Sequence, residues 1–263
     1  MKTTDIAAAL RLDKQRVAQA FKASAATYDE HATVQRQIGG QLIHLLQGVA
    51  IGGLGRVLEI GCCTGILTEL LVGQFPIDTL YLNDIVEEFC SATSKRIAQR
   101  VPYLHVLPGD IEHCPLPTEL DMVISSATLQ WMTDLPTLFA RIHSALRDQG
   151  YIVFSIFSPG TMGEINALTG RGLAYHSPET IERMVADRFH LISLQSETTR
   201  LYFPSVREIL RHIRQTGGGG LGGSSALKGR FKEFSRQYRD RFASDKGFPV
   251  SYASTFVVAQ KRK

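Results

Sequence analysis

Hydrophobic residues in the middle of the chain follow two patterns that alternate. Short runs of consecutive apolar residues, typical of strands buried on both faces, are separated by longer segments whose apolar residues recur at helical spacing. The expected strands are 57–60, 79–82, 104–107, 122–125 and 151–156, and the expected helices are 65–74, 86–100 and 135–147. This rhythm predicts an α/β fold with a mostly parallel, doubly wound sheet that has helices on both faces.

The two ends of the chain follow a different pattern. Residues 14–47 have helical spacing that is interrupted near 27–29, and a turn is expected at 48–55. After Ser158 we expect a helix at 178–189 with Ser177 as its N-cap, a strand at 191–203, helices at 205–216 and 231–242 around a glycine-rich loop at 216–229, and a closing strand at 252–259. The last two strands are expected to pair antiparallel at the sheet edge.

These patterns suggest three parts of the chain. We expect an N-terminal helical cap at 1–50, a ligand-binding core at 51–160, and a C-terminal part at 161–263 that completes the sheet. The helices at about 204–247 would form an insertion before the last of seven strands. Such an insertion can lie over the carboxyl ends of the strands, where open α/β sheets bind ligands.

Composition adds few constraints, but the charge is unevenly distributed. The 263 residues, 44% of them hydrophobic, suffice for one sizeable core. No run is apolar enough for a signal peptide or a membrane helix, so we expect a cytoplasmic protein. Residues 200–246 hold eleven Lys and Arg against four Asp and Glu, an excess of seven positive charges on a chain whose net charge is +4. Either an acidic partner or a solvated helix surface explains this excess. We find no RNA-binding module and predict no nucleic-acid partner.

A glycine loop follows the first strand in the stretch "RVLEIGCCTGILTELL". Gly61 would let the chain leave the strand sharply, and Gly65 would let the next helix pack closely. The vicinal pair Cys62 and Cys63 raises the alternative of redox or metal chemistry, but no C-x-x-C accompanies it, so we expect free thiols and no metal.

Two later strands end in acids that suit a nucleoside. Asp84 lies where a carboxylate can accept hydrogen bonds from both hydroxyls of a ribose. Asp110 can bind the amine of adenine, with Ile85 and Ile111 on the two faces of the ring. The alternative is that both acids are ordinary turn or cap residues. The set fits a dinucleotide or S-adenosylmethionine, and the i, i+4 spacing of Gly61 and Gly65, which differs from G-x-G-x-x-G, favours S-adenosylmethionine.

Beyond the loop, the chain resembles the malonyl-acyl-carrier-protein O-methyltransferase family of biotin synthesis almost from end to end. "RVAQAFKASAATYDEHATVQRQI" is similar to that family's N-terminal signature, with Phe21, Ala25, Tyr28, Ala32 and Gln35 in register. "PGDIEHCPLP", "ISSATLQWMTDL", "ILRHIRQTG" and "FPVSYASTFVVAQK" are similar to four further segments of the family. The departures are Cys63 in place of glycine, Ser126 in place of asparagine, and an enlarged glycine loop at 217–223.

The resemblance implies a Rossmann-like class I methyltransferase that uses S-adenosylmethionine to methylate the free carboxylate of a malonyl thioester. The implied cofactor contacts are Gln35, Glu59, Gly61, Cys62, Cys63, Gly65, Asp84, Ile85, Asp110, Ile111 and Ser126. On this reading Tyr28 closes the methyl-transfer chamber, and Arg214 or Arg211 holds the malonyl carboxylate. Gln130 and Trp131 would line the acceptor side.

The basic residues Arg230, Lys232 and Arg236 would attract an acidic acyl carrier protein, although coenzyme A could also carry the malonyl group. Three alternatives stay open. They are a methyltransferase for another small carboxylic acid, a nucleotide-binding oxidoreductase, and a non-catalytic relative that only binds the cofactor or a partner.

Overall fold

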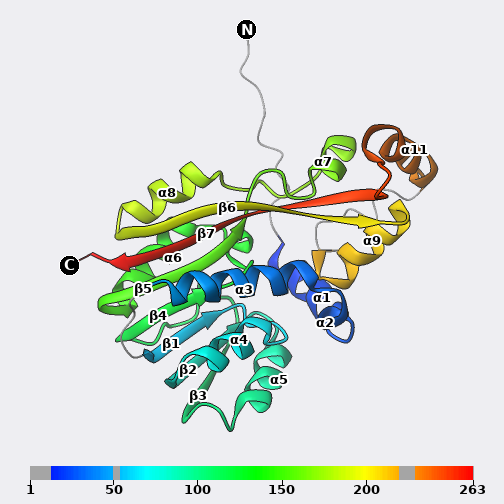
Figure 1. Cartoon of the computed structure of the whole chain (residues 1–263). Helices are drawn as coiled ribbons and strands as arrows, with labels where there is room; N and C mark the ends of the chain where they lie inside the picture. Colours follow the sequence, from blue (N-terminus) through cyan, green and yellow to red (C-terminus); the bar gives the residue numbers. More distant parts are fainter. Residues whose placement is uncertain (1–12, 50–53, 219–228, 263) are drawn as a thin grey trace.

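The computed structural model describes residues 13–49, 54–218 and 229–262 (Figure 1). Within these residues seven strands form one sheet in the order β3-β2-β1-β4-β5-β7-β6. The strands are β1 (Leu54–Ile60), β2 (Ile77–Asp84), β3 (Tyr103–Pro108), β4 (Leu120–Ser125), β5 (Leu146–Phe157), β6 (Phe189–Phe203) and β7 (Phe248–Lys261). All described strands are parallel except β7, which pairs antiparallel with both β5 and β6. The predicted fold class and the antiparallel pairing of the last two strands are confirmed.

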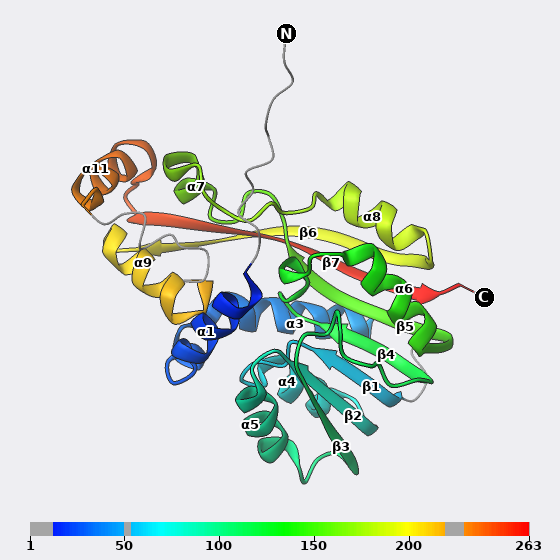
Figure 2. The same ribbon diagram turned by 180° about the vertical axis from the view of Figure 1, so that it is seen from behind.

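Helices cover both faces of this sheet. Those N-terminal to β5 are α1 (Lys14–Ser24), α2 (Tyr28–His31), α3 (Thr33–Gln47), α4 (Ile66–Gln74), α5 (Glu87–Ile97), a 3-10 turn η1 (Leu129–Trp131) and α6 (Leu135–Ala145). Those that follow β5 are α7 (Gly163–Thr169), α8 (Pro178–Ala186), α9 (Val206–Gln215) and α11 (Phe231–Phe242). Helices α3, α4 and α5 pack on one face, and α6 and α8 pack on the other, which Figure 2 shows from behind.

Helices α1 and α2 lie beside the loops after β1, β2 and β4, whereas α3 packs on a face of the sheet. The expected interruption near 27–29 is present, since α1 ends at Ser24 and α3 starts at Thr33 with the short α2 between them. Helix α3 buries Val34, Ile38 and Leu42 against the sheet. Helices α1 and α2 contact α9, so the cap and the C-terminal insertion meet (Figure 1). The division into three parts stays a prediction.

The structure differs from the expected elements in several places. The helix expected at 178–189 ends at Ala186, and Phe189 already begins β6. The helix expected at 86–100 ends at Ile97. The helix expected at 135–147 ends at Ala145, because Leu146 is extended and already pairs with Leu120 as the start of β5. The turn expected at 48–55 is shorter, since Leu54 and Gly55 belong to β1. Helix α7 was not expected from the sequence.

The expected N-cap of α8 is confirmed, since the Ser177 hydroxyl accepts a hydrogen bond from the Thr180 N–H at 3.3 Å.

The insertion between β6 and β7 contains α9 and α11. Most of the expected glycine-rich loop, residues 219–228, lies outside the described residues. At its start, Gly217 has a φ of +77°, and a Cβ there would lie 2.4 Å from the Phe21 ring, so only glycine fits.

Every helix in the described part of the chain is too short or too polar to cross a lipid bilayer. The cytoplasmic location expected from the sequence stays a prediction.

Candidate functional site

The glycine loop after β1 is held by side chains that approach it from two other elements. Gly61 has a φ of +75°, and a Cβ there would lie 2.2 Å from the Thr128 hydroxyl. Gly65 has a φ of +89°, and a Cβ there would lie 2.9 Å from the Thr93 methyl group. Both glycines are therefore required by close packing and by backbone conformation. The predicted sharp exit and close helix packing are confirmed.

Cys63, at the middle of the loop, has a left-handed φ of +45°. Its N–H donates a hydrogen bond to the Asp84 carboxylate at 2.9 Å, and its carbonyl accepts one from the Thr93 hydroxyl at 3.0 Å. The Cys63 thiol faces the Tyr28 hydroxyl, and burial raises the pKa of Cys63, so the thiol stays neutral. Cys62 is buried on the other side of the loop, with its thiol next to that of Cys90.

Two acids near the loop are buried, and burial raises both of their pKa values. The pKa of Asp84 rises to about 6, although the N–H groups of Val86 and Cys63 hydrogen-bond its carboxylate and act in the opposite direction. The pKa of Glu59 rises to about 7 for the same reason. Neither carboxylate oxygen of Glu59 has a hydrogen-bond partner among the described residues. Glu59 belongs to β1 and does not line the cavity described next.

A cavity of about 80 Å³ opens beside the loop. It brings together nine predicted site residues from five separate segments, namely Tyr28, Gly61, Cys63, Asp84, Ile85, Asp110, Ile111, Ser126 and Trp131. Ile85 is 37% exposed, which is unusual for a large apolar side chain, whereas Ile111 is buried. An exposed apolar side chain beside two carboxylates fits a nucleoside, whose flat base and hydroxyls need both kinds of contact. The lining residues not predicted from the sequence include Lys14, Val17, Phe21, Thr128 and Met132.

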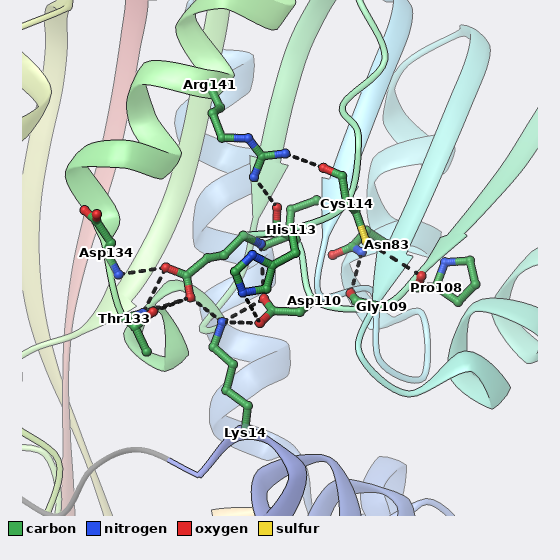
Figure 3. Close-up of polar contacts among 12 residues, drawn as sticks. Lys14, Asn83, Pro108, Gly109, Asp110, His113, Cys114, Thr133, Asp134 and Arg141 are labelled. Atoms are coloured by element: carbon green, nitrogen blue, oxygen red, sulfur yellow. Dashed lines mark hydrogen bonds and ion pairs between the residues drawn. The ribbon is translucent and has the colours of Figure 1, made fainter.

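Lys14, the first residue of α1, contacts the wall of this cavity at Asp110 (Figure 3). Its ammonium group donates to both oxygens of Asp110 at 2.7 Å and also pairs with Glu112. Burial raises the pKa of Glu112, but hydrogen bonds from Lys14 and from the N–H groups of Thr133 and Asp134 outweigh this and lower it to about 2. Lys14 is 96 residues from Asp110 in the chain, so no local pattern reveals the contact.

A second cavity of about 40 Å³ adjoins the first. The two share Phe21, Tyr28, Ala127 and Trp131 as walls. The Phe21 ring meets the Trp131 ring edge-on, with centroids 6.0 Å apart, and lies 6.2 Å from the Tyr28 ring. These aromatic rings form an apolar partition between the cavities.

The second cavity contains residues that sequence reasoning found and residues that it missed. Gln35 and Gln130 line this cavity instead of the first. Tyr175 and Tyr252 also line it, and neither was assigned a role from the sequence. They come from the loop before α8 and from β7, far from every cofactor motif.

The arginines predicted to hold a carboxylate lie elsewhere. Arg211 and Arg214 are exposed on the outer face of α9, and Arg211 pairs with Glu208 at 2.9 Å. Arg230, Lys232 and Arg236 are exposed at or near α11, and Arg236 pairs with Glu233 at 2.7 Å. None of these five residues lines either cavity. They form a basic outer surface, as expected for contact with a partner more than with a small buried group.

Comparisons with known proteins agree with this geometry. Residues 58–154 match the model of a methyltransferase domain. The chain is 38% identical over 255 residues to the malonyl-[acyl-carrier protein] O-methyltransferase of Chlorobium phaeovibrioides, covering 95% of this chain and 98% of that protein. It is 32% identical to the enzyme of the same name from Acinetobacter baylyi, covering 96% and 98%. The chain belongs to the malonyl-[acyl-carrier protein] O-methyltransferase family. The resemblance noted in the sequence is thereby confirmed.

Solved structures support the fold of this methyltransferase. The YcgJ protein of Bacillus subtilis superimposes with a TM-score of 0.59 at 15% identity, covering 84% of this chain and 98% of that one. The N-methyltransferase NodS of Bradyrhizobium japonicum, solved with S-adenosyl-L-homocysteine, superimposes with a TM-score of 0.52 at 14% identity, covering 90% and 99%. At such low identity these likenesses establish the class I fold alone.

Proposed function

We propose that this methyltransferase transfers a methyl group from S-adenosylmethionine to the free carboxylate of a malonyl group on acyl carrier protein. The product is the malonyl methyl ester that primes pimeloyl synthesis for biotin. The single observation that best supports the proposal is the pair of adjoining cavities, one lined by Asp84 and Asp110 and the other lined by uncharged groups. The family relatives named malonyl-[acyl-carrier protein] O-methyltransferase support the same assignment.

The first cavity has the groups that S-adenosylmethionine needs. The Asp84 carboxylate accepts hydrogen bonds from the ribose hydroxyls, and Ile85 and Ile111 contact the two faces of the adenine. Asp110 accepts from the adenine amine, and it shares its remaining lone pairs with Lys14. The loop between Ser126 and Thr128 lines the end of the cavity nearest the partition. When bound, the cofactor supplies a methyl group on a positively charged sulfur.

The protein then has to align the reactants and remove water. A malonyl carboxyl is ionised at neutral pH, as ordinary carboxyls are, so no general base is required. Attack by an anion on a cation removes charge in the transition state, and a dry site therefore favours the reaction when binding elsewhere offsets desolvation. Phe21, Tyr28 and Trp131 exclude water from the junction of the two cavities, where oxygen, methyl carbon and sulfur must lie in a line.

The basic outer surface of α9 and α11 supplies the carrier contact. Its exposed positive groups include Arg214, Arg230 and Lys232. Acyl carrier proteins are acidic, so these groups attract the carrier over several ångströms and raise the association rate. Because exposed charges are screened by salt, the attraction weakens as ionic strength rises.

Mass spectrometry tests the proposed reaction directly. Malonyl-acyl carrier protein incubated with S-adenosylmethionine and the enzyme is expected to gain the mass of one methylene group, and acetyl-acyl carrier protein is expected to gain nothing. Methylation of the acetyl carrier would show that the acceptor is not the free carboxylate. No gain on the malonyl carrier, with cofactor binding intact, would refute the substrate assignment.

A charge-removal variant tests the carrier surface. Arg230→Ala combined with Lys232→Ala should raise KM for malonyl-acyl carrier protein severalfold at low salt and leave KM for malonyl-pantetheine, which carries no phosphate, unchanged. Lys95→Ala, which removes an exposed positive charge from the distant α5, is the matched control. Equal effects of the double variant on both acceptors would argue against carrier docking at this surface.

A further inference from the structure

The second cavity is uncharged and small. None of its lining residues is Asp, Glu, Lys, Arg or His. Its volume is about 40 Å³, and a buried water needs about 10–15 Å³ of such space. A carboxylate, with three heavy atoms, is small enough to enter this cavity. The rest of the acceptor has to extend outward from it.

Several hydrogen-bond donors in this cavity are already engaged by the protein. The Thr161 hydroxyl bonds to the Ala253 carbonyl at 2.8 Å, and the Thr216 hydroxyl bonds to the His212 carbonyl at 3.0 Å. The Gln130 amide donates to the Ala127 carbonyl at 2.5 Å. The Tyr28 hydroxyl faces the Cys63 thiol.

Three atoms of lining residues are buried without a hydrogen-bond partner among the described residues, namely the Oε1 atoms of Gln35 and Gln130 and the Tyr252 hydroxyl. Amide oxygens only accept, so the Tyr252 hydroxyl is the one of these three that can donate to a ligand. Tyr252 is 2% exposed. A buried hydroxyl without a partner destabilises a protein unless a ligand or water satisfies it. Tyr175 lies close enough to affect the pKa of Tyr252, and burial raises the pKa of both phenols. Both hydroxyls therefore keep their protons at neutral pH and remain donors.

We propose that the hydroxyls of Tyr252 and Tyr175 hold the acceptor carboxylate during methyl transfer, which rests on the function proposed above. One carboxylate oxygen accepts from the phenols, and the other faces the partition and attacks the methyl carbon. The new bond forms between that oxygen and carbon while the carbon–sulfur bond breaks, and its electron pair returns to sulfur. The Gln35 amide and the Trp131 indole line the same cavity and can support the acid.

Neutral donors suit this reaction better than an arginine. A guanidinium binds both carboxylate oxygens at once, which withdraws charge from the nucleophile. It would also place a second positive charge beside the sulfonium cation in a site of low dielectric. Two phenols hold the acid without either penalty. The sulfonium then remains the main positive charge that compensates the buried carboxylate.

The test is the pair of variants Tyr252→Phe and Tyr175→Phe, assayed with malonyl-coenzyme A, whose small size removes the carrier contact. Each variant should lower kcat/KM by roughly tenfold to a hundredfold, the loss expected for one hydrogen bond to a charged group. Affinity for S-adenosylmethionine should not change. Tyr238→Phe is the matched control, because its buried hydroxyl bonds to the Pro249 carbonyl outside the cavity and its loss should not affect kcat/KM.

Stability separates a ligand contact from a structural one. Because the Tyr252 hydroxyl is buried without a partner, Tyr252→Phe should melt at the same temperature as the wild type or higher while it loses activity. Marked destabilisation of Tyr252→Phe would show a structural partner and overturn the proposal, as would an unchanged kcat/KM. Loss of activity in Arg214→Ala but not in Tyr252→Phe would also overturn it. If the wild-type enzyme itself fails to methylate malonyl thioesters, the proposed function has failed first.

Discussion

The relative stabilities of two Cys63 variants, Cys63→Gly and Cys63→Ala, test the strain in the cofactor loop. Cys63 has a φ of +45°, a left-handed conformation that costs a residue with a Cβ roughly 1–2 kcal/mol. Glycine has no such penalty, but its extra freedom in the unfolded chain costs about 0.5–1 kcal/mol relative to alanine. Cys63→Gly should therefore be more stable than Cys63→Ala by about 0.5–1 kcal/mol. Both variants lose the thiol contact with Tyr28, so that contact cancels in the comparison.

The measurement is urea denaturation of the two variants without cofactor, followed by calorimetric titration with S-adenosylmethionine. At an ordinary position the order is reversed, so Lys95→Gly and Lys95→Ala on α5 serve as the negative control. Gln149, with a φ of +62° and an exposed side chain, serves as the positive control. A Cys63→Ala variant at least as stable as Cys63→Gly would show that the backbone at this position is not strained.

Cofactor affinity in the glycine variant addresses the role of the thiol. We expect Cys63→Gly to bind S-adenosylmethionine at least as tightly as the wild type, because the Cys63 N–H that bonds to Asp84 is retained. If binding survives and methyl transfer is lost, the thiol has a chemical function in addition to its place in the loop.

Three further predictions concern the first cavity. Burial raises the pKa of Asp84 to about 6, and ribose hydroxyls favour the ionised acid. Affinity for S-adenosylmethionine should therefore fall as pH drops through about 6, and calorimetry should show a flat profile for Asp84→Asn. Lys14→Met removes the contact of α1 with Asp110. Because a partly buried ion pair is worth about 1 kcal/mol, this change should speed cofactor association about fivefold in stopped-flow experiments. An unchanged association rate contradicts this prediction. Gly61→Ala should lower stability by about 2 kcal/mol or more, because its Cβ meets Thr128, and adding Thr128→Gly should recover part of the loss.

The cofactor side of the site was predictable because of how parallel sheets are built. Gly61, Asp84 and Asp110 follow three neighbouring parallel strands, so their order in the chain translates directly into proximity at one edge of the sheet. The strands themselves were found from short apolar runs. Their ends were less certain, since Leu146 continues the apolar pattern of α6 and yet begins β5.

The acceptor side was predictable only in part, because the resemblance placed Gln130 and Trp131 there but gave no role to Tyr175 or Tyr252. Tyr175 comes from a loop and Tyr252 from the antiparallel strand β7. On the cofactor side, Lys14 comes from the start of α1 and was missed for the same reason. Their proximity to the cofactor loop depends on long-range packing that leaves no local pattern. Helix α7 was missed for a related reason, since it is seven residues long and starts after Met162, whose φ of +51° no periodicity signals.

The direction of Arg211 on α9 does follow from the sequence, because the apolar residues of the helix define its inward face. Buried Val206, Ile209 and Ile213 recur at intervals of three and four and fix the inward face. At about 100° per residue, Arg211 lies roughly 200° from Ile209 and therefore points away from the core. The charges of the insertion thus face outward, where they can attract a carrier protein without entering the cavity. The acceptor carboxylate is then left to neutral donors, which is the arrangement that keeps its oxygen reactive.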